Sequence, residues 1–242
     1  IPEAVSITEL RKSWAIADMG LSIPKATRLV TDGKRKGVEF ERIVNKKSYA
    51  RAISHSPEKL GELSREFATF CKKLHSTPCK TELFRDIADQ FIEEIKHCKT
   101  FTQDEIDRMV KFMESLPRTT NCVHGDMHIG NALIAEGKQY WIDLADFGYG
   151  NPMFDLGMLH FICFGFPSEE DMQRLYHVSC AQLKEIFEAF LCGYFGEDCD
   201  IAERTAEIAK FSALHMAKFD ARGTMLPHMK AMVQEWLLDK IQ

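Results

Sequence analysis

The chain lacks the long apolar runs and the excess of positive charge that mark two large classes of protein. A helix that crosses a bilayer needs about 20 consecutive apolar residues. The most apolar stretch, residues 153–166, is shorter and contains both Asp155 and His160. Lysine and arginine total 31 against 36 acidic residues, which gives a net charge of −5 over 242 residues. We therefore expect no membrane partner and no nucleic-acid partner.

Paired cysteine motifs are also lacking. None of the eight cysteines forms a Cys-x-x-Cys motif, and their spacing fits neither a disulfide framework nor a zinc site. Several of them lie among apolar residues, where a free cysteine behaves as a small hydrophobic side chain. These features predict reduced thiols in a cytoplasmic protein.

The composition is that of a globular protein, with 45% hydrophobic and 28% charged residues. A helix is predicted over residues 6–20, with Thr8 as its N-cap. Strands are predicted over residues 26–30, 37–43, 119–123, 131–134 and 139–144. Apolar residues three and four apart predict helices over residues 57–75, 83–96, 103–116, 154–164, 169–178, 181–195 and 201–217, and from residue 227 onward. The pattern predicts an α+β fold with a small β-containing start and a large helical body.

Three polar residues near the middle of the chain, Asp126, Asn131 and Asp143, form a candidate catalytic set. Asp126 lies in a loop after a predicted strand, and Asn131 follows it by five residues. A turn at Gly137 makes a hairpin that brings Asn131 and Asp143 to the same end. Carboxylate and amide oxygens suit Mg²⁺ better than Zn²⁺, and the remaining carboxylate can accept a proton from a hydroxyl. Such a set, with an aspartate five residues before an asparagine, is typical of phosphoryl transfer in kinases.

Three motifs in order carry a resemblance to a known family: His124-Gly125-Asp126-x-x-x-x-Asn131, Ile142-Asp143 and Gly150-x-Pro152-x-x-Asp155. They resemble the motifs of the aminoglycoside phosphotransferase and choline kinase superfamily. The resemblance implies a protein-kinase-like fold of two lobes and an enzyme that uses ATP (or GTP) and Mg²⁺. It also implies transfer of the γ-phosphate to a hydroxyl of a small molecule, such as an aminoglycoside, a choline-like compound, a sugar or an amino alcohol.

The resemblance assigns a role to each residue of these motifs. Asp126 takes the place of the catalytic base, which orients and deprotonates the acceptor hydroxyl. Asn131 and Asp143 take the places of the Mg²⁺ ligands. His124 belongs to the catalytic set and is expected to brace the loop more than to react. Asp155 is expected to hold the catalytic loop by hydrogen bonds from the start of its helix.

The resemblance covers nearly the whole chain and implies a division into two lobes. Residues 1–44 look like a partial N-terminal lobe with the regulatory helix, the last strands and the hinge, and residues 45–242 look like a helical C-terminal lobe. The glycine-rich loop and the lysine-bearing strand of such kinases find no match before Glu9, so we expect an N-terminal lobe without them. Asn151 also replaces the aspartate that is usual in the third motif.

Four residues of the N-terminal part are expected to contact the nucleotide or to organise its site. Glu9 stands where the ion-pairing glutamate of the regulatory helix would be, and Phe40 stands at the gatekeeper position. The resemblance implies that the Glu41 carbonyl and the Ile43 N–H bond the base. An ordinary edge strand over residues 38–43 is the alternative.

Two nearby patterns suggest other assignments. Asp146-Phe147-Gly148 spells the metal motif of protein kinases, but Asp143 follows its strand directly, as the superfamily pattern requires. The pattern His124-x-Asp126-x-His128 suggests the metal cluster of a hydrolase, although no further residues complete a zinc set.

Two further activities compete with a small-molecule phosphotransferase. The unmatched phosphate-binding segment favours a catalytically weak pseudokinase that only binds a nucleotide. A protein kinase is disfavoured, because Gly125 replaces the usual arginine and no Ala-Pro-Glu segment follows Asp143.

The distribution of charge suggests the acceptor's chemistry. Residues 25–51 contain nine basic and three acidic residues, a net charge of +6. Residues 166–204 contain nine acidic and three basic residues, a net charge of −6. An acidic wall in the C-terminal lobe would attract a cationic acceptor, while solvated acidic helix faces are the simpler explanation.

Overall fold

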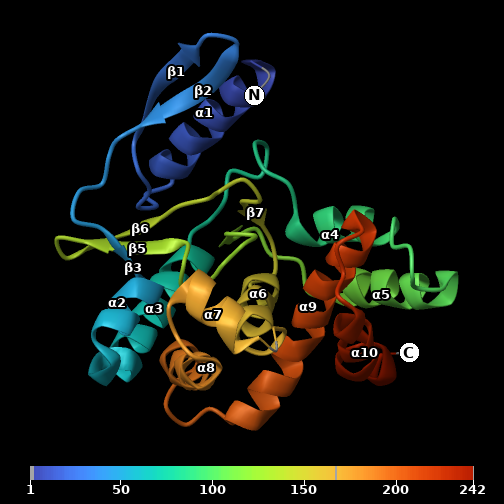
Figure 1. Cartoon of the computed structure of the whole chain (residues 1–242). Helices are drawn as coiled ribbons and strands as arrows, with labels where there is room; N and C mark the ends of the chain where they lie inside the picture. Colours follow the sequence, from blue (N-terminus) through green and yellow to red (C-terminus); the bar gives the residue numbers. More distant parts are fainter. Residues whose placement is uncertain (1–2, 167, 242) are drawn as a thin grey trace.

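The computed structural model describes residues 3–166 and 168–241 (Figure 1). The helices are α1 Glu3–Asp18, α2 Tyr49–His55, α3 Leu60–His75, α4 Ile87–Ile95, α5 Gln103–Ser115, α6 Met153–Phe164, α7 Glu169–Tyr176, α8 Cys180–Phe195, α9 Ile201–Arg222 and α10 Pro227–Trp236. The strands are β1 Ala26–Asp32, β2 Arg35–Phe40, β3 Lys47–Ser48, β4 Cys122–Val123, β5 Ala132–Ala135, β6 Lys138–Trp141 and β7 Gly148–Tyr149. All strand pairs are antiparallel and short, so the predicted α+β class is confirmed.

Helix α1 packs on the β1–β2 hairpin at one end of the molecule (Figure 1). The antiparallel register places Leu29 opposite Val38. The indole N–H of Trp14 donates to the Ala26 carbonyl over 2.9 Å, which ties the helix to the start of β1. Strand β3, which begins at Lys47, pairs with β5, which lies in the segment expected to form the C-terminal lobe. The boundary between the two lobes at residues 44 and 45 remains a prediction.

Two boundaries in this part differ from the sequence predictions. Helix α1 already includes Glu3, so the assignment of Thr8 as its N-cap is wrong. The Thr8 hydroxyl instead donates to the Ala4 carbonyl within the helix, at 2.9 Å. Strand β2 ends at Phe40 and does not continue to residue 43, because β1 begins directly opposite, at Ala26.

The periodicity of apolar residues did not predict where two of the helices begin. Helix α2 was not expected, since seven residues are too few for a periodic pattern. The Ser48 hydroxyl caps it by accepting the Arg51 N–H at 3.2 Å. Helix α4 begins at Ile87, four residues later than predicted, because the Asp86 carboxylate accepts the Ala88 N–H at 2.8 Å and fixes the N-terminus there.

The small sheets bring the motifs of the middle region together. Strand β5 lies between β3 and β6, and β4 pairs with β7. Val123 lies opposite Gly148 in the second pair. The loop after β4 therefore begins beside the point where the loop before β7 ends. The backbone N–H of Trp141 also donates to the Ser22 carbonyl over 2.9 Å, which connects the N-terminal part to β6.

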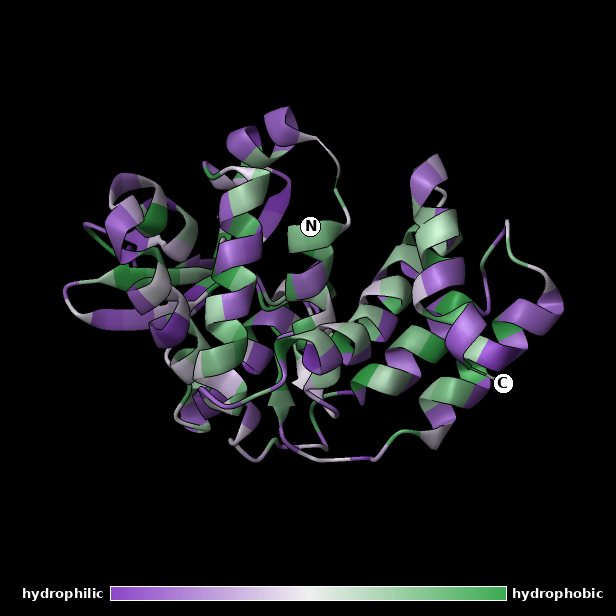
Figure 2. Cartoon of the chain, turned by 90° about the horizontal axis from the view of Figure 1, so that it is seen from below, coloured by the Kyte–Doolittle hydropathy of each residue, from purple (hydrophilic) through white to green (hydrophobic). Residues whose placement is uncertain are grey.

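The helical body is built around α6, most of whose residues are buried. Helices α8 and α9 pack against it, and the helices on the outside of the molecule carry both hydrophilic and hydrophobic residues (Figure 2). Gly157 of α6 touches α9 so closely that a Cβ there would lie 2.6 Å from the Cβ of Phe211. Of the helices in the described part of the chain, none is both long and apolar enough to cross a membrane.

The close approach of α6 to α9 makes Gly157 a test of the packing. Gly157→Ala would gain up to about 1 kcal/mol of helix propensity, but it would force the helices apart at a cost of about 1–3 kcal/mol. We expect a net loss in the free energy of unfolding, measured by denaturant titration.

Gly61→Ala is the matched control. A Cβ at Gly61 would meet only the end of the flexible Arg65 side chain, at 3.3 Å. That variant is expected to be as stable as the wild type or more stable. Equal destabilisation by both substitutions would contradict the close-packing explanation.

Candidate active site

The catalytic loop, residues 124–131, runs from the end of β4 to the start of β5. The backbone N–H of Ile142 donates to the Asn131 carbonyl over 3.0 Å, so pairing of the hairpin continues past Ala132 and Trp141. Asn131 and Asp143 consequently lie at the same end of the hairpin, where the turn at Gly137 was expected to bring them.

Asn131 is bonded to the candidate base. Its side-chain N–H groups donate to the Asp126 carbonyl at 2.9 Å and to the Asp126 Oδ2 at 3.1 Å. These two bonds fix the loop between the residues and set the orientation of the amide group. The amide oxygen of Asn131 is thereby left for another partner.

Asp143 has an unusual backbone. Its φ is +58°, in the left-handed region that non-glycine residues seldom occupy. Aspartate tolerates this conformation better than most residues, and such strain concentrates at functional sites. The Asp143 side chain is exposed, and within residues 3–166 and 168–241 no group bonds or neutralises its carboxylate. It is available to bind a cation.

His124 bridges the catalytic loop and the strand that leads to Asp143. Its Nδ1 accepts the Asp126 N–H at 3.3 Å, and its Nε2–H donates to the Ile142 carbonyl at 3.0 Å. Burial lowers the pKa of His124, so the ring is neutral at physiological pH. Both ring nitrogens are occupied, which supports the bracing role predicted for this residue.

Asp155 organises the first half of the catalytic loop from the start of α6. One oxygen accepts the His124 N–H at 2.7 Å and the His75 Nε2–H at 2.9 Å. The other accepts the Gly125 N–H at 2.8 Å. Burial favours the neutral acid, but the His75 hydrogen bond and the contacts with His124 outweigh it and hold the Asp155 pKa below its ordinary value. A fully buried carboxylate thus remains ionised at neutral pH.

His75 is a member of the site that the sequence gave no reason to select. It lies at the end of α3, 80 residues from Asp155, and its Nδ1 is 2.7 Å from the Tyr194 hydroxyl. Only the tertiary structure brings α3, α6 and α8 to this point.

The contact between Gly125 and Asp146 shows where Asp146 lies relative to the catalytic loop. Gly125 has φ +84°, and a Cβ there would collide with the backbone oxygen of Asp146. The backbone of Asp146 therefore rests on the catalytic loop. Asp143, two residues after the end of β6, is the aspartate that lies at the end of the hairpin.

The predicted alternative of a His124-x-Asp126-x-His128 metal cluster finds no support. In the described residues no group of three or more histidine, cysteine, aspartate or glutamate side chains could hold a metal ion. His128 turns its Nδ1 to the Gly130 N–H at 3.0 Å. Burial lowers the pKa of His128 to about 4, so this ring is also neutral.

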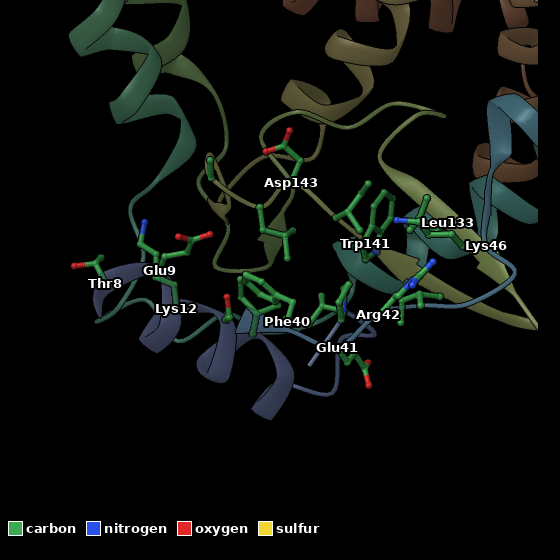
Figure 3. A pocket seen from close by; sticks show the side chains of 18 of the residues that line it. Thr8, Glu9, Lys12, Phe40, Glu41, Arg42, Lys46, Leu133, Trp141 and Asp143 are labelled. Carbon is green, nitrogen blue, oxygen red and sulfur yellow. The ribbon is translucent and has the colours of Figure 1, made fainter. Parts of the chain in front are cut away.

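A cavity of about 830 Å³ opens between α1, β2 and the β5–β6 hairpin (Figure 3). Its lining includes all four residues expected at a nucleotide site, Glu9, Phe40, Glu41 and Ile43, together with Asp143. Figure 3 shows Glu9 on α1 and Phe40 on the hairpin side, with Asp143 across the cavity. Asp126 and Asn131 do not line it, so the candidate base lies beyond its edge.

The segment after β2 leaves backbone groups available to a ligand. The Glu41 N–H donates to the Lys25 carbonyl at 2.9 Å, and its carboxylate accepts the Lys25 N–H at 3.0 Å. In the described part of the chain, neither the Glu41 carbonyl nor the Ile43 N–H has a hydrogen-bond partner.

Lys12 is a further cavity residue that the sequence interpretation passed over. It lies one turn after Glu9 on α1, a spacing that places both side chains on one face. Its Nζ lies 6.0 Å from the centre of the Phe84 ring. The i, i+3 relation to Glu9 was the available signal.

The family model described as "Phosphotransferase enzyme family" matches residues 10–189. This is most of the chain, which therefore belongs to that family. The resemblance to the superfamily and the prediction of a phosphotransferase are both confirmed. No curated protein sequence matches the chain significantly.

Solved structures of small-molecule kinases share the fold. ADP-bound aminoglycoside phosphotransferase APH(2″)-Ib is 17% identical, with a TM-score of 0.59 over 98% of this chain and 83% of that one. Amicoumacin kinase hAmiN, in complex with AMP-PNP, Ca²⁺ and Ami, is 15% identical, with a TM-score of 0.56 over 95% and 75%. Choline kinase LicA from Streptococcus pneumoniae is 14% identical, with a TM-score of 0.51 over 96% and 78%. These likenesses establish the predicted protein-kinase-like fold.

Removing the Asp155 carboxylate should destabilise the catalytic loop. Asp155→Ala leaves three buried donors without an acceptor, and we expect the free energy of unfolding to fall by about 3–5 kcal/mol. The measurement is denaturant unfolding at pH 7.

The pH dependence of Asp155→Asn is the accompanying check. Because the native pKa of Asp155 is depressed, its contribution is complete above the ordinary aspartate pKa of about 3.9 and is lost as the pH falls through the lower native value. The difference in stability between the wild type and Asp155→Asn should shrink as the pH falls through that range. A constant difference would contradict an ionised Asp155.

Proposed function

We propose that the protein transfers the γ-phosphate of ATP, or of GTP, to a hydroxyl group of a small molecule. The observation that carries this proposal is the hydrogen bond of Asn131 to Asp126, with Asp143 at the same end of the hairpin and on the wall of a cavity of about 830 Å³. A candidate base, two candidate oxygen ligands and a cavity that could hold a nucleotide would thus adjoin one another. Family membership supplies the reaction class.

The cavity is our candidate for the nucleotide site. The Glu41 carbonyl and the Ile43 N–H would bond the base, and Phe40 would border it as the gatekeeper. Their lack of protein partners favours this assignment over the edge-strand alternative. Two solved structures with the same fold contain AMP-PNP or ADP, which supports a nucleotide here.

The oxygen atoms of Asn131 and Asp143 fit a divalent cation. Asn131 directs its N–H groups to Asp126, so its amide oxygen can coordinate, and the Asp143 carboxylate is exposed. Mg²⁺ bound there would neutralise charge on the phosphates. The Ca²⁺ in the amicoumacin kinase complex supports a divalent ion in general.

Asp126 would receive the proton of the acceptor. Its side chain is 33% exposed, so a hydroxyl can approach it. As the hydroxyl oxygen bonds to the γ-phosphorus, the bond from that phosphorus to the β-phosphate oxygen breaks and the proton passes to the Asp126 carboxylate. His124 and Asp155 would hold the loop in place without contacting the acceptor. Catalysis would then rest on positioning and charge neutralisation.

A nucleotide-binding module with weak catalysis is the second candidate function. It is favoured by Glu9, which lines the cavity but has no ion-pair partner among residues 3–166 and 168–241. Calorimetry with ATP and Mg²⁺ beside a phosphate-transfer assay separates the two functions. A cytoplasmic location, in keeping with eight free cysteines, belongs to the leading proposal.

Asp126→Asn is the direct test of the base. We expect kcat to fall by about 10²- to 10⁴-fold while ATP affinity stays within twofold, because Asp126 lies outside the cavity lining. Asp104→Asn, at an exposed site outside both the cavity lining and the acidic segment 166–204, is the control and should retain full activity. Full activity of Asp126→Asn would remove this residue from the base role.

The acceptor is proposed to be cationic. Residues 166–204 carry a net charge of −6. Glu197 pairs with Arg65 and Asp171 with Arg174, but most of the acidic side chains in this segment have no such partner within the described residues. We expect aminoglycosides, choline-like amines or amino alcohols to be phosphorylated faster than neutral sugars, with a KM that rises with ionic strength. Turnover of neutral or anionic hydroxyl compounds alone would contradict a cationic acceptor.

A further inference from the structure

His128 lies inside the catalytic loop, two residues after Asp126, and none of the roles described so far uses it. Its Nδ1 accepts the Gly130 N–H over 3.0 Å, which assigns the ring proton to Nε2. That Nε2 lies 3.8 Å from the Oδ2 atom of Asp126. The only ring N–H of His128 therefore faces the carboxylate of the candidate base.

Close packing fixes this ring. The His128 side chain is 15% exposed, and its ring meets that of Tyr176 edge-on, with centroids 5.4 Å apart at 85°. A Cβ on Gly130 would lie 2.8 Å from the His128 Cε1 and 2.9 Å from its Nδ1. Glycine at this position thus leaves the space that the ring occupies. Tyr176 is the last residue of α7, so an element of the helical body supports the geometry of the loop.

The two oxygens of Asp126 have different surroundings. Oδ2 accepts an N–H of Asn131 at 3.1 Å and faces His128, whereas no described protein group bonds Oδ1. We propose that His128 is a positioning residue whose Nε2–H, together with the Asn131 amide, holds Oδ2 and leaves Oδ1 to receive the proton of the acceptor. This inference rests on the proposed function. Catalytic hydrogen bonds are often long before substrates bind and shorten in the reacting complex, so we expect the 3.8 Å separation to close.

The experiment compares three substitutions in steady-state kinetics with ATP, Mg²⁺ and an accepted substrate. His128→Phe keeps an aromatic ring against Tyr176 but removes the N–H, and we expect kcat to fall by up to about 100-fold with the KM for ATP unchanged. His128→Gln places an amide N–H near the position of Nε2 and should recover most of kcat. Gly130→Ala displaces the ring and should lower kcat in the same direction as His128→Phe.

Folding and the parent activity are controlled separately. Thermal unfolding and ATP affinity should match the wild type in His128→Phe and His128→Gln, and His97→Phe, at an exposed histidine distant in sequence, should leave kcat unchanged. Wild-type kcat in His128→Phe, or equal losses in His128→Phe and His128→Gln, would overturn the positioning role while leaving the phosphotransferase intact. Absence of turnover in the wild type itself would overturn both.

Discussion

The buried carboxylate of Asp155 is the interaction on which the arrangement of the catalytic loop depends. It is an ionised group inside an almost wholly apolar helix, a placement that is tolerated only when donors surround it. Three donors do so, and two of them are successive backbone N–H groups of the loop itself. The requirement to satisfy this charge therefore also sets the path of the chain into Asp126. An apolar side chain of similar size would need no such donors and would place no such demand on the loop.

A short series of hydrogen bonds connects Asp155 to the candidate metal site. His124, whose N–H is bonded by Asp155, reaches the Ile142 carbonyl with its ring, and Ile142 in turn pairs with Asn131. Gly125 is the next residue bonded by Asp155. The backbone of Asp146 occupies the space that a side chain at Gly125 would need. The protein's own contacts thus fix the side chain of Asn131 against Asp126 and the backbone that leads to Asp143. Such preorganisation is what an electrostatic mechanism of phosphoryl transfer needs.

The parts that could be predicted from sequence are those fixed by local spacing. Asp126 and Asn131 are five residues apart, and Asn131 and Asp143 share one hairpin, so a strand–turn pattern was enough to bring them together. His75 and Tyr176 could not be found in this way, because His75 precedes the loop by 49 residues and Tyr176 follows it by 45. The end of strand β2 was predicted three residues too far along the chain, since that end is set by where β1 begins and not by the composition of β2. Helix α2 was missed because a cap at Ser48, and not periodicity, starts it.

The two walls of the cavity differ in how firmly the protein holds them. The wall formed by Leu133, Trp141 and Asp143 continues into the hydrophobic core, where Trp141 stacks on Phe70 at 4.4 Å. The opposite wall comes from α1 and a two-stranded hairpin in which β1 buries only Ala26. Elements with few buried contacts open at low free energy, and a ligand that binds only the closed arrangement stabilises it in proportion to its affinity. A nucleotide bound between both walls, as proposed, would therefore order the β1–β2 hairpin. The hydrogen bonds around Asp126 do not involve that hairpin. Under the proposed function, a change confined to the hairpin would act on nucleotide binding and leave the hydrogen bonds of Asp126 unchanged.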